Sequence, residues 1–253
     1  MQSRLTQEEW NYLSGHFGMC EHAPTRHRNS VRVSDLLDEA RCSDYLDLLT
    51  VQLQSPSRMI TASQFMKRYA FLTAAPLLYA MSAYNRGLDL SAGNCLLEST
   101  PGLSWLELVS LDDVNAAMPE ASERHAWRDT VIQSYFAGNL GKLIQVMSGV
   151  AKVPKPILWE NAAVRVFSLY EKRIRASGDQ QEQARGRADF QYLIQQAPGA
   201  LFGEKQNPLS PFYGKPVSST VTDTPMRVRK TCCFYYEVSS VEEYCSNCPK
   251  VKN

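Results

Sequence analysis

The chain has 253 residues, with 27 Lys or Arg, 26 Asp or Glu, and 44% hydrophobic side chains. This is the composition of a globular protein of one large or two small domains, and the formal charge of +1 excludes a generic nucleic-acid binder and a protein with a strongly acidic tail. With 13 Gly and 13 Pro, collagen-like and low-complexity chains are excluded as well.

The N-terminus, from Met1 to Trp10, has no basic-then-apolar run and is not predicted to be a secretory signal. The longest uncharged stretch, 69–85, is shorter than the ~20 apolar residues that a bilayer requires, so we expect a buried core helix there. An odd cysteine count without an export signal is typical of a reducing compartment, and we expect a cytoplasmic protein.

The first half of the chain predicts two helices followed by a small sheet. The first helix is expected from Ser34, as N-cap, to about Leu53. A second begins near Thr61, presents one apolar stripe, and is expected to kink at Pro76. Short apolar runs separated by Gly and Pro predict a small antiparallel sheet near residues 87–110.

Three further helices are expected in the second half, over 121–147, 157–177 and 180–196. Gly138 and Gly141 lie inside the first of them and indicate close helix packing, a bend or a break. Pro156 suits the first position of the second helix, and basic residues precede its end at Gly178. The fold class predicted from these elements is mainly α with a small antiparallel β-sheet, an α+β protein.

Composition divides the chain into three parts. Residues 1–200 are expected to form a mainly helical domain, and the Pro- and Gly-rich residues 201–225 a connector. Residues 226–253 would then form a short C-terminal segment. Residues 1–120 carry a net charge of −5 and residues 121–253 one of +6. This gradient is either ordinary solvated surface or a basic face for an anionic ligand, a metal cluster or a lipid headgroup.

The cysteines are the unusual feature of the sequence, because four of the seven fall in the last 22 residues. Cys232, Cys233, Cys245 and Cys248 have the spacing C-C-x11-C-x2-C. Adjacent cysteines in an extended chain point to opposite faces, which suits a tetrahedral zinc site poorly and a larger two-iron cluster better. From spacing alone, iron–sulfur and zinc sites remain about equally favoured, and disulfides or inert core cysteines are less so.

Two segments carry a resemblance to a known family. Arg229-Lys-Thr-Cys-Cys-Phe-Tyr-Tyr236 with Tyr244-Cys-Ser-Asn-Cys-Pro249 resembles the C-terminal box of FhuF-type ferric-siderophore reductases, which holds a 2Fe–2S cluster. Pro156-Ile-Leu-Trp-Glu-Asn-Ala-Ala163 is similar to a helix that this family shares with the C-terminal part of siderophore synthetases, and residues 61–90 resemble the central helix and following strand. The spacer of 11 residues after Cys233 is one longer than in the best-known members.

The resemblance implies one-electron reduction of a ferric, hydroxamate-type siderophore, with Cys232, Cys233, Cys245 and Cys248 as the cluster ligands. Arg227, Arg229 and Lys230 are candidates to offset the negative charge of the cluster, or else form a solvated basic strand. The implied partners are the ferric siderophore and an unidentified electron donor, which could be a ferredoxin, a flavoprotein or a small thiol. No nucleic-acid partner is implied, and peripheral association with an importer or with the inner face of the cell membrane is left open.

Other residues are weaker candidates. Trp159, Asn161 and Arg165 could contact the siderophore, although a core Trp and a hydrogen-bonded Asn that fixes helix packing explain the first two equally well. Cys42 and Cys95 are expected in the core, and Cys20 with nearby histidines is a poor second metal site. The alternative function is a zinc-stabilised ligand-binding module without redox activity.

Overall fold

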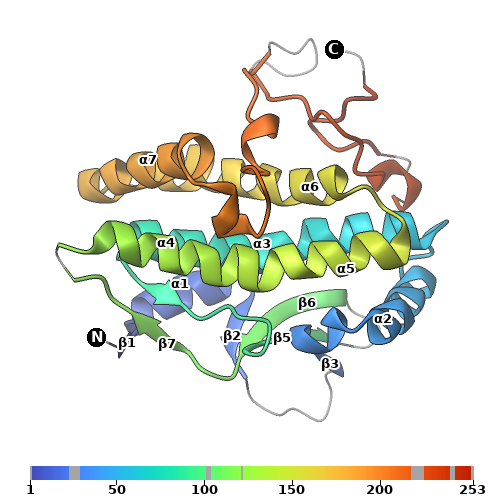
Figure 1. The fold of residues 1–253 in the computed structure, drawn as a ribbon, viewed down its shortest axis with the longest axis horizontal. Helices are drawn as coiled ribbons and strands as arrows, with labels where there is room; N and C mark the ends of the chain where they lie inside the picture. Colours follow the sequence, from blue (N-terminus) through green and yellow to red (C-terminus); the bar gives the residue numbers. More distant parts are fainter. Residues whose placement is uncertain are drawn as a thin grey trace.

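The computed structural model describes residues 2–22, 29–100, 104–120, 122–217, 225–239 and 243–251. A long helix, α3 (Arg58–Tyr84), runs through the middle of the protein (Figure 1). Helices α6 (Lys155–Ser168) and α7 (Gln180–Gln195) lie on one side of it, and a sheet lies on the other. This arrangement confirms the predicted α+β class with a C-terminal cysteine segment.

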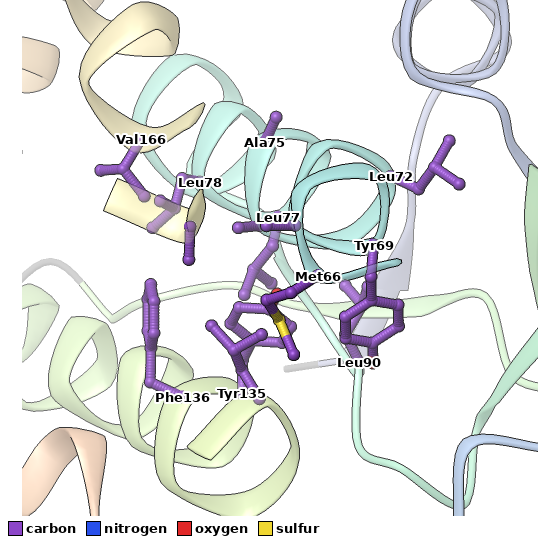
Figure 2. Packing of buried hydrophobic residues seen from close by; sticks show 14 of the residues in the cluster. Met66, Tyr69, Leu72, Ala75, Leu77, Leu78, Leu90, Tyr135, Phe136 and Val166 are labelled. Atoms are coloured by element: carbon purple, nitrogen blue, oxygen red, sulfur yellow. The ribbon is translucent and has the colours of Figure 1, made fainter. Parts of the chain in front are cut away.

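Helix α3 organises the core because almost every face of it is covered. Ser57 caps its first turn by accepting a hydrogen bond from the backbone of Ile60, so the helix begins three residues before the predicted start. Asn85 ends it in the left-handed conformation. Pro76 lies inside and the helix continues through it. Figure 2 shows α3 side chains packing against Tyr135, Phe136 and other residues from neighbouring elements.

The expected helix over 34–53 is divided in two. Residues Val33–Leu37 form a 3-10 turn, and α2 spans Glu39–Gln52. The N-cap is Asp38, whose carboxylate accepts from the backbone N–H of Arg41, and not Ser34. An aspartate followed by a helical run is a cap of the same quality as a serine, so the sequence offered two starts and the structure uses the second.

The sheet contains the expected hairpin, β5 (Cys95–Thr100) with β6 (Ser104–Leu111), paired antiparallel. It is mixed, however, because β2 (Met19–Glu21) pairs parallel to β6. Helix α1 (Gln7–Phe17) ends at Gly18, whose positive φ of 68° turns the chain directly into β2. A strand that follows a helix in this way arrives beside β6 in the same direction, which alternation of apolar residues alone does not reveal.

The remaining strands complete two sheets. The four-stranded sheet has the order β2-β6-β5-β3, with β3 at Asn29–Arg32. A second sheet has the order β1-β7-β4, formed by Gln2–Arg4, Asn115–Ala117 and Gly87–Leu88. Both lie on the side of α3 opposite α6 and α7 (Figure 1).

The expected helix over 121–147 is interrupted by one wide turn. It consists of α4 (Arg124–Tyr135), a π-helical turn (Phe136–Leu140) and α5 (Gly141–Ala151). A Cβ on Gly141 would lie 2.8 Å from the carbonyl oxygen of Phe202, so this glycine permits close packing. The expected helix over 157–177 is likewise divided. It consists of α6, a π-helical turn (Leu169–Arg173) and a 3-10 turn (Ile174–Ala176).

The first half of the predicted connector packs into the helical core. Short 3-10 turns form at Gly199–Phe202 and Ser210–Phe212, and Phe202, Leu209 and Phe212 are buried. Prolines and glycines there therefore shape a packed loop. The division of the chain at residues 200 and 225 stays a prediction. Within the described part of the chain, no helix is both long and apolar enough to cross a membrane.

Candidate metal centre

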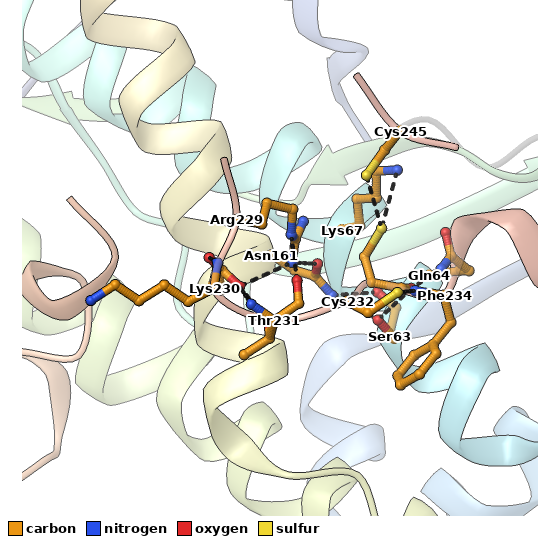
Figure 3. A network of polar contacts seen from close by, with 12 residues as sticks. Ser63, Gln64, Lys67, Asn161, Arg229, Lys230, Thr231, Cys232, Phe234 and Cys245 are labelled. Atoms are coloured by element: carbon orange, nitrogen blue, oxygen red, sulfur yellow. Dashed lines mark hydrogen bonds and ion pairs between the residues drawn. The ribbon is translucent and has the colours of Figure 1, made fainter. Parts of the chain in front are cut away.

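The four C-terminal cysteines lie where the last segment of the chain crosses α6 and reaches the first turns of α3 (Figures 1 and 3). The sulfur atoms of Cys233 and Cys245 are 3.7 Å apart. Cys248 donates its backbone N–H to the carbonyl of Cys245 at 3.0 Å, so these two form one tight turn. Cys233 and Cys248 are buried, and Cys232 and Cys245 are partly exposed.

The backbone around the adjacent cysteines is turned and not extended. Phe234 has a φ of 61°, in the left-handed region that non-glycine residues rarely adopt. Its N–H donates to the sulfur of Cys232 at 3.3 Å. On the other side, Ser63 and Gln64 of α3 both donate to the carbonyl of Cys233. Two polar side chains of the long helix therefore fix this turn against the domain.

A buried carboxylate on α6 binds the residues just before the cysteines. Glu160 is 1% exposed and accepts from the backbone N–H of Lys230 at 2.6 Å and that of Thr231 at 2.7 Å. The hydroxyl of Thr231 donates to the same carboxylate. Hydrogen bonds to a charged acceptor are about twice as strong as neutral ones, so Glu160 is the main attachment point of the segment.

Asn161, the next residue of α6, joins three parts of the chain. Its amide donates to the carbonyl and the hydroxyl of Ser63 on α3, both at 2.9 Å, and its oxygen accepts from Arg229 at 2.7 Å. The Arg229 guanidinium lies 3.7 Å from Glu160, and its backbone N–H donates to Asn247 beside the last two cysteines. Figure 3 shows this network between the two helices and the cysteines.

The thiols lie in a positive environment. The Nζ atom of Lys67 on α3 is 4.0 Å from the sulfur of Cys233. The hydrogen bond between the Cys233 and Cys245 thiols, together with the charges of Lys67 and Arg229, lowers the pKa of Cys233 against the opposing effect of burial. The same hydrogen bond and burial raise the pKa of Cys245. Within this pair the thiolate form is therefore favoured at Cys233 over Cys245, and the nearby cations favour negative charge on the sulfur atoms.

The sulfur atoms of Cys233 and Cys245 fit two ligand positions of an iron–sulfur cofactor. Two thiolates on one tetrahedral ion with metal–sulfur bonds of about 2.3 Å lie about 3.8 Å apart, which matches the spacing of Cys233 and Cys245. Soft thiolates with nearby hydrogen-bond donors are typical ligands of iron–sulfur clusters. Among the residues that the structure describes, no three His, Cys, Asp or Glu side chains form a group that could hold a metal ion.

A pocket of about 720 Å³ lies beside the cysteines, between α6 and two stretches of the C-terminal segment, Pro225–Arg229 and Tyr244–Asn247. We call it the α6 pocket. Asn161, Arg165 and Ser168 line it from α6, and Met226, Tyr244 and Cys245 line it from the C-terminal segment. Cys245 is thus both one of the four C-terminal cysteines and part of the wall of a cavity that a small molecule can enter.

The structure places the weaker candidates in different surroundings. Asn161, Arg165, Arg227 and Arg229 all line the α6 pocket. Trp159 packs against Phe202 and donates to Glu204, as expected of a core tryptophan. Lys230 is exposed and its side chain points away from the thiols in Figure 3. Cys42 and Cys95 are fully buried, as predicted. Of the histidines near Cys20 in the sequence, His27 lies outside the described residues.

Four residues of the site were missed by sequence reasoning: Ser63, Gln64, Lys67 and Glu160. Each is a polar residue within a helical stretch that otherwise presents apolar side chains. A carboxylate such as Glu160, between a buried Trp and a buried Asn, is a signal that could have been used. Buried charges are retained only with partners, and the partner here is the C-terminal segment.

Comparison with known proteins agrees with this geometry. A family described as ferric iron reductase FhuF-like transporter matches residues 63–218, and one described as FhuF 2Fe-2S C-terminal domain matches residues 229–250. No curated protein sequence matches. Among solved structures, the aerobactin synthetase IucC from a hypervirulent pathotype of Klebsiella pneumoniae is similar with a TM-score of 0.51 and 17% identity. The similarity covers 74% of this chain and only 37% of the synthetase, so it describes a shared fold.

Proposed function

The chain belongs to the FhuF-like family of ferric iron reductases, and we propose that it reduces the iron of a ferric siderophore of the hydroxamate type by one electron. The observation that carries this proposal is the close pair of the Cys233 and Cys245 thiols, held beside Lys67 on a polar surface of the domain and next to a pocket, in the segment that also contains Cys232 and Cys248. The reaction releases ferrous iron in the cytoplasm.

Cys232, Cys233, Cys245 and Cys248 would hold a 2Fe–2S cluster, which would supply the single electron for each ferric ion. The protein residues contribute position and charge: Glu160 and Asn161 fix the segment, and Lys67 and Arg229 stabilise negative charge on the thiolates. Outer-sphere transfer of an electron requires no acid or base catalyst.

The chemistry of the substrate explains why one electron is sufficient. Hydroxamate oxygens are hard donors that bind ferric iron far more tightly than ferrous iron. One electron added to the ferric chelate gives a ferrous chelate with the same ligand, and the weakened complex then loses its iron. The electron is replaced by a one-electron donor, which is a reduced ferredoxin, a flavoprotein or a small thiol. The protein acts free in the cytoplasm or in peripheral association with an importer or the inner face of the cell membrane, and it needs no nucleic acid.

The proposal is tested on protein prepared anaerobically with iron and sulfide supplied. The expected sample is coloured, contains iron and acid-labile sulfide, and after reduction converts a ferric trihydroxamate chelate to ferrous iron. A colourless sample that contains zinc would contradict the proposal and support a zinc-stabilised binding module.

The cysteine variant Cys245→Ser makes the test specific. We expect it to abolish the visible absorption or shift it strongly, and to abolish chelate reduction, because it removes one of the paired thiolates. The matched control is Cys20→Ser on β2, which should keep both signals. Unchanged turnover in Cys245→Ser would refute the role of the thiols.

A further inference from the structure

The α6 pocket has the size and position of a substrate site. Its volume of about 720 Å³ falls within the usual range for small-molecule pockets, about 300–1,000 Å³. Cys245 forms part of its wall, so an occupant touches a residue of the thiol group directly. Since electron transfer requires close approach and not bond formation, a cavity that ends on a ligand residue is a suitable place for an electron acceptor.

More positively than negatively charged side chains line the pocket. Glu171 is paired with Arg227, with both N–O distances at 3.0 Å, and Glu160 is paired with Arg229 at 3.7 Å. The other three cations that line it are Lys67, Arg165 and Lys172. In the part of the chain that the structure describes, none of these three has a carboxylate within 4.0 Å.

The three remaining cations have different places. Lys67 lies nearest the thiols and neutralises their charge. Arg165 donates its Nε–H to the carbonyl of Lys67 and stacks near Phe71, which fixes the guanidinium at the inner end of the pocket. Lys172 is exposed in the π-helical turn that follows α6 and lines the same pocket. Burial, followed by the charges of Arg229 and Arg68, lowers the pKa of Arg165.

We infer that the α6 pocket is the binding site of the ferric chelate, and that it prefers uncharged or negatively charged chelates to cationic ones. This inference rests on the proposed function for its substrate. The guanidinium of Arg165 donates to hydroxamate or carboxylate oxygens, and Lys172 attracts negative charge at the entrance. The excess of positive charge disfavours a chelate with a free ammonium group.

The location is tested by filling the pocket without touching a thiol. Ser168→Trp on α6 places a large ring in the cavity, and Ser134→Trp on the exposed face of α4 is the matched control. The probe is the gallium(III) complex of a linear trihydroxamate, which has the shape of the ferric complex but accepts no electron. We expect its Kd to rise at least about tenfold, or 1.4 kcal/mol, in Ser168→Trp only, with iron content unchanged in both variants. Equal affinity in the two variants would overturn the location.

The charge preference is tested with three forms of one chelate. The first form is a linear trihydroxamate with a free terminal amine, which is positively charged. Acetylation of the amine gives a neutral form and succinylation a negatively charged one, and all three keep the same iron ligands. We expect affinity for the gallium complexes to rise from the first to the third. Lys172→Gln should reduce this difference about threefold, whereas Lys142→Gln on α5 should not. Tightest binding of the cationic form would refute the preference.

The two proposals fail separately. If the wild-type protein binds the gallium complex in the pocket but reduces no ferric chelate, the proposed function is wrong and the binding site stands. If it reduces ferric chelates and Ser168→Trp changes neither Kd nor KM, the reductase stands and the pocket is not its substrate site.

Discussion

The helical domain and the C-terminal segment are held by different forces. Helix α3 is buried along most of its length in a continuous apolar core. In the described residues after Phe212, the only buried apolar side chains are Cys233 and Cys248, and the contacts of the segment to the domain are mainly hydrogen bonds to Ser63, Glu160 and Asn161. The domain is therefore stabilised mainly by the hydrophobic effect, whereas the segment is held by polar contacts and, under the proposed function, by metal–sulfur bonds.

The strongest way to separate the two regions is to remove the iron with a chelator under anaerobic conditions. Metal–sulfur bonds contribute about 10 kcal/mol or more to small metal-bound folds, so their loss should open the segment. We expect amide exchange over residues 229–248 to accelerate at least about a hundredfold. Exchange in α3 should change less than about threefold in the same sample. Equal acceleration in both regions would show that the domain also depends on the metal.

The opposite experiment weakens the domain and leaves the segment intact. Leu78→Ala removes a fully buried side chain of α3 that Figure 2 shows among the core residues, and should lower the free energy of unfolding by about 3 kcal/mol. Urea denaturation followed by circular dichroism measures this change. Leu48→Ala on α2, where the side chain is 71% exposed, is the control and should cost less than about 0.5 kcal/mol. Loss of cluster absorption from folded Leu78→Ala protein would contradict the independence of the domain and the C-terminal segment.

Glu160→Gln tests the polar attachment itself. The amide keeps the size of the carboxylate but loses its charge, and its NH2 group faces an N–H group of Lys230 or Thr231 that it cannot accept from. We therefore expect the attachment of the C-terminal segment to the domain to weaken by about 2 kcal/mol. Chelator-driven release of iron should then be about thirtyfold faster, with the unfolding of the domain nearly unchanged. Glu171→Gln, which breaks a more exposed pair with Arg227, should accelerate release less than about fivefold. An identical effect in both variants would show that Glu160 has no special role.

Lys67→Met has the smallest expected effect and changes the thiols without detaching them. Reduction adds negative charge, which the ammonium group 4.0 Å from Cys233 stabilises. Its removal should lower the midpoint potential by about 60 mV, a tenfold change for a one-electron couple. A potentiometric titration followed by electron paramagnetic resonance measures the shift, and Lys142→Met should leave the potential unchanged. A higher potential in Lys67→Met would reverse the assigned role.

The sequence predicted those features that depend on local patterns. The apolar stripe of α3, the hairpin of β5 and β6, and the group of four cysteines were all visible as spacings. The parallel pairing of β2 was not, because it depends on a turn at Gly18 and on a partner about 90 residues away. The polar residues that bind the cysteine segment were missed for the same reason. Gln64 and Glu160 look like ordinary helix residues in the sequence, and only the packing of α3 against α6 brings them together.

The contacts of Asn161 imply an order of events. The surface that receives the cysteines is divided between α3 and α6, and Asn161 of α6 hydrogen-bonds both to Ser63 of α3 and to Arg229. That surface exists only after the two helices have met. The cysteines follow both helices in the sequence and are synthesised after them, so the helices can pack first and present a finished template. Maturation of the metal centre thereby becomes a check on folding, because a misfolded domain offers the thiols nothing to dock against.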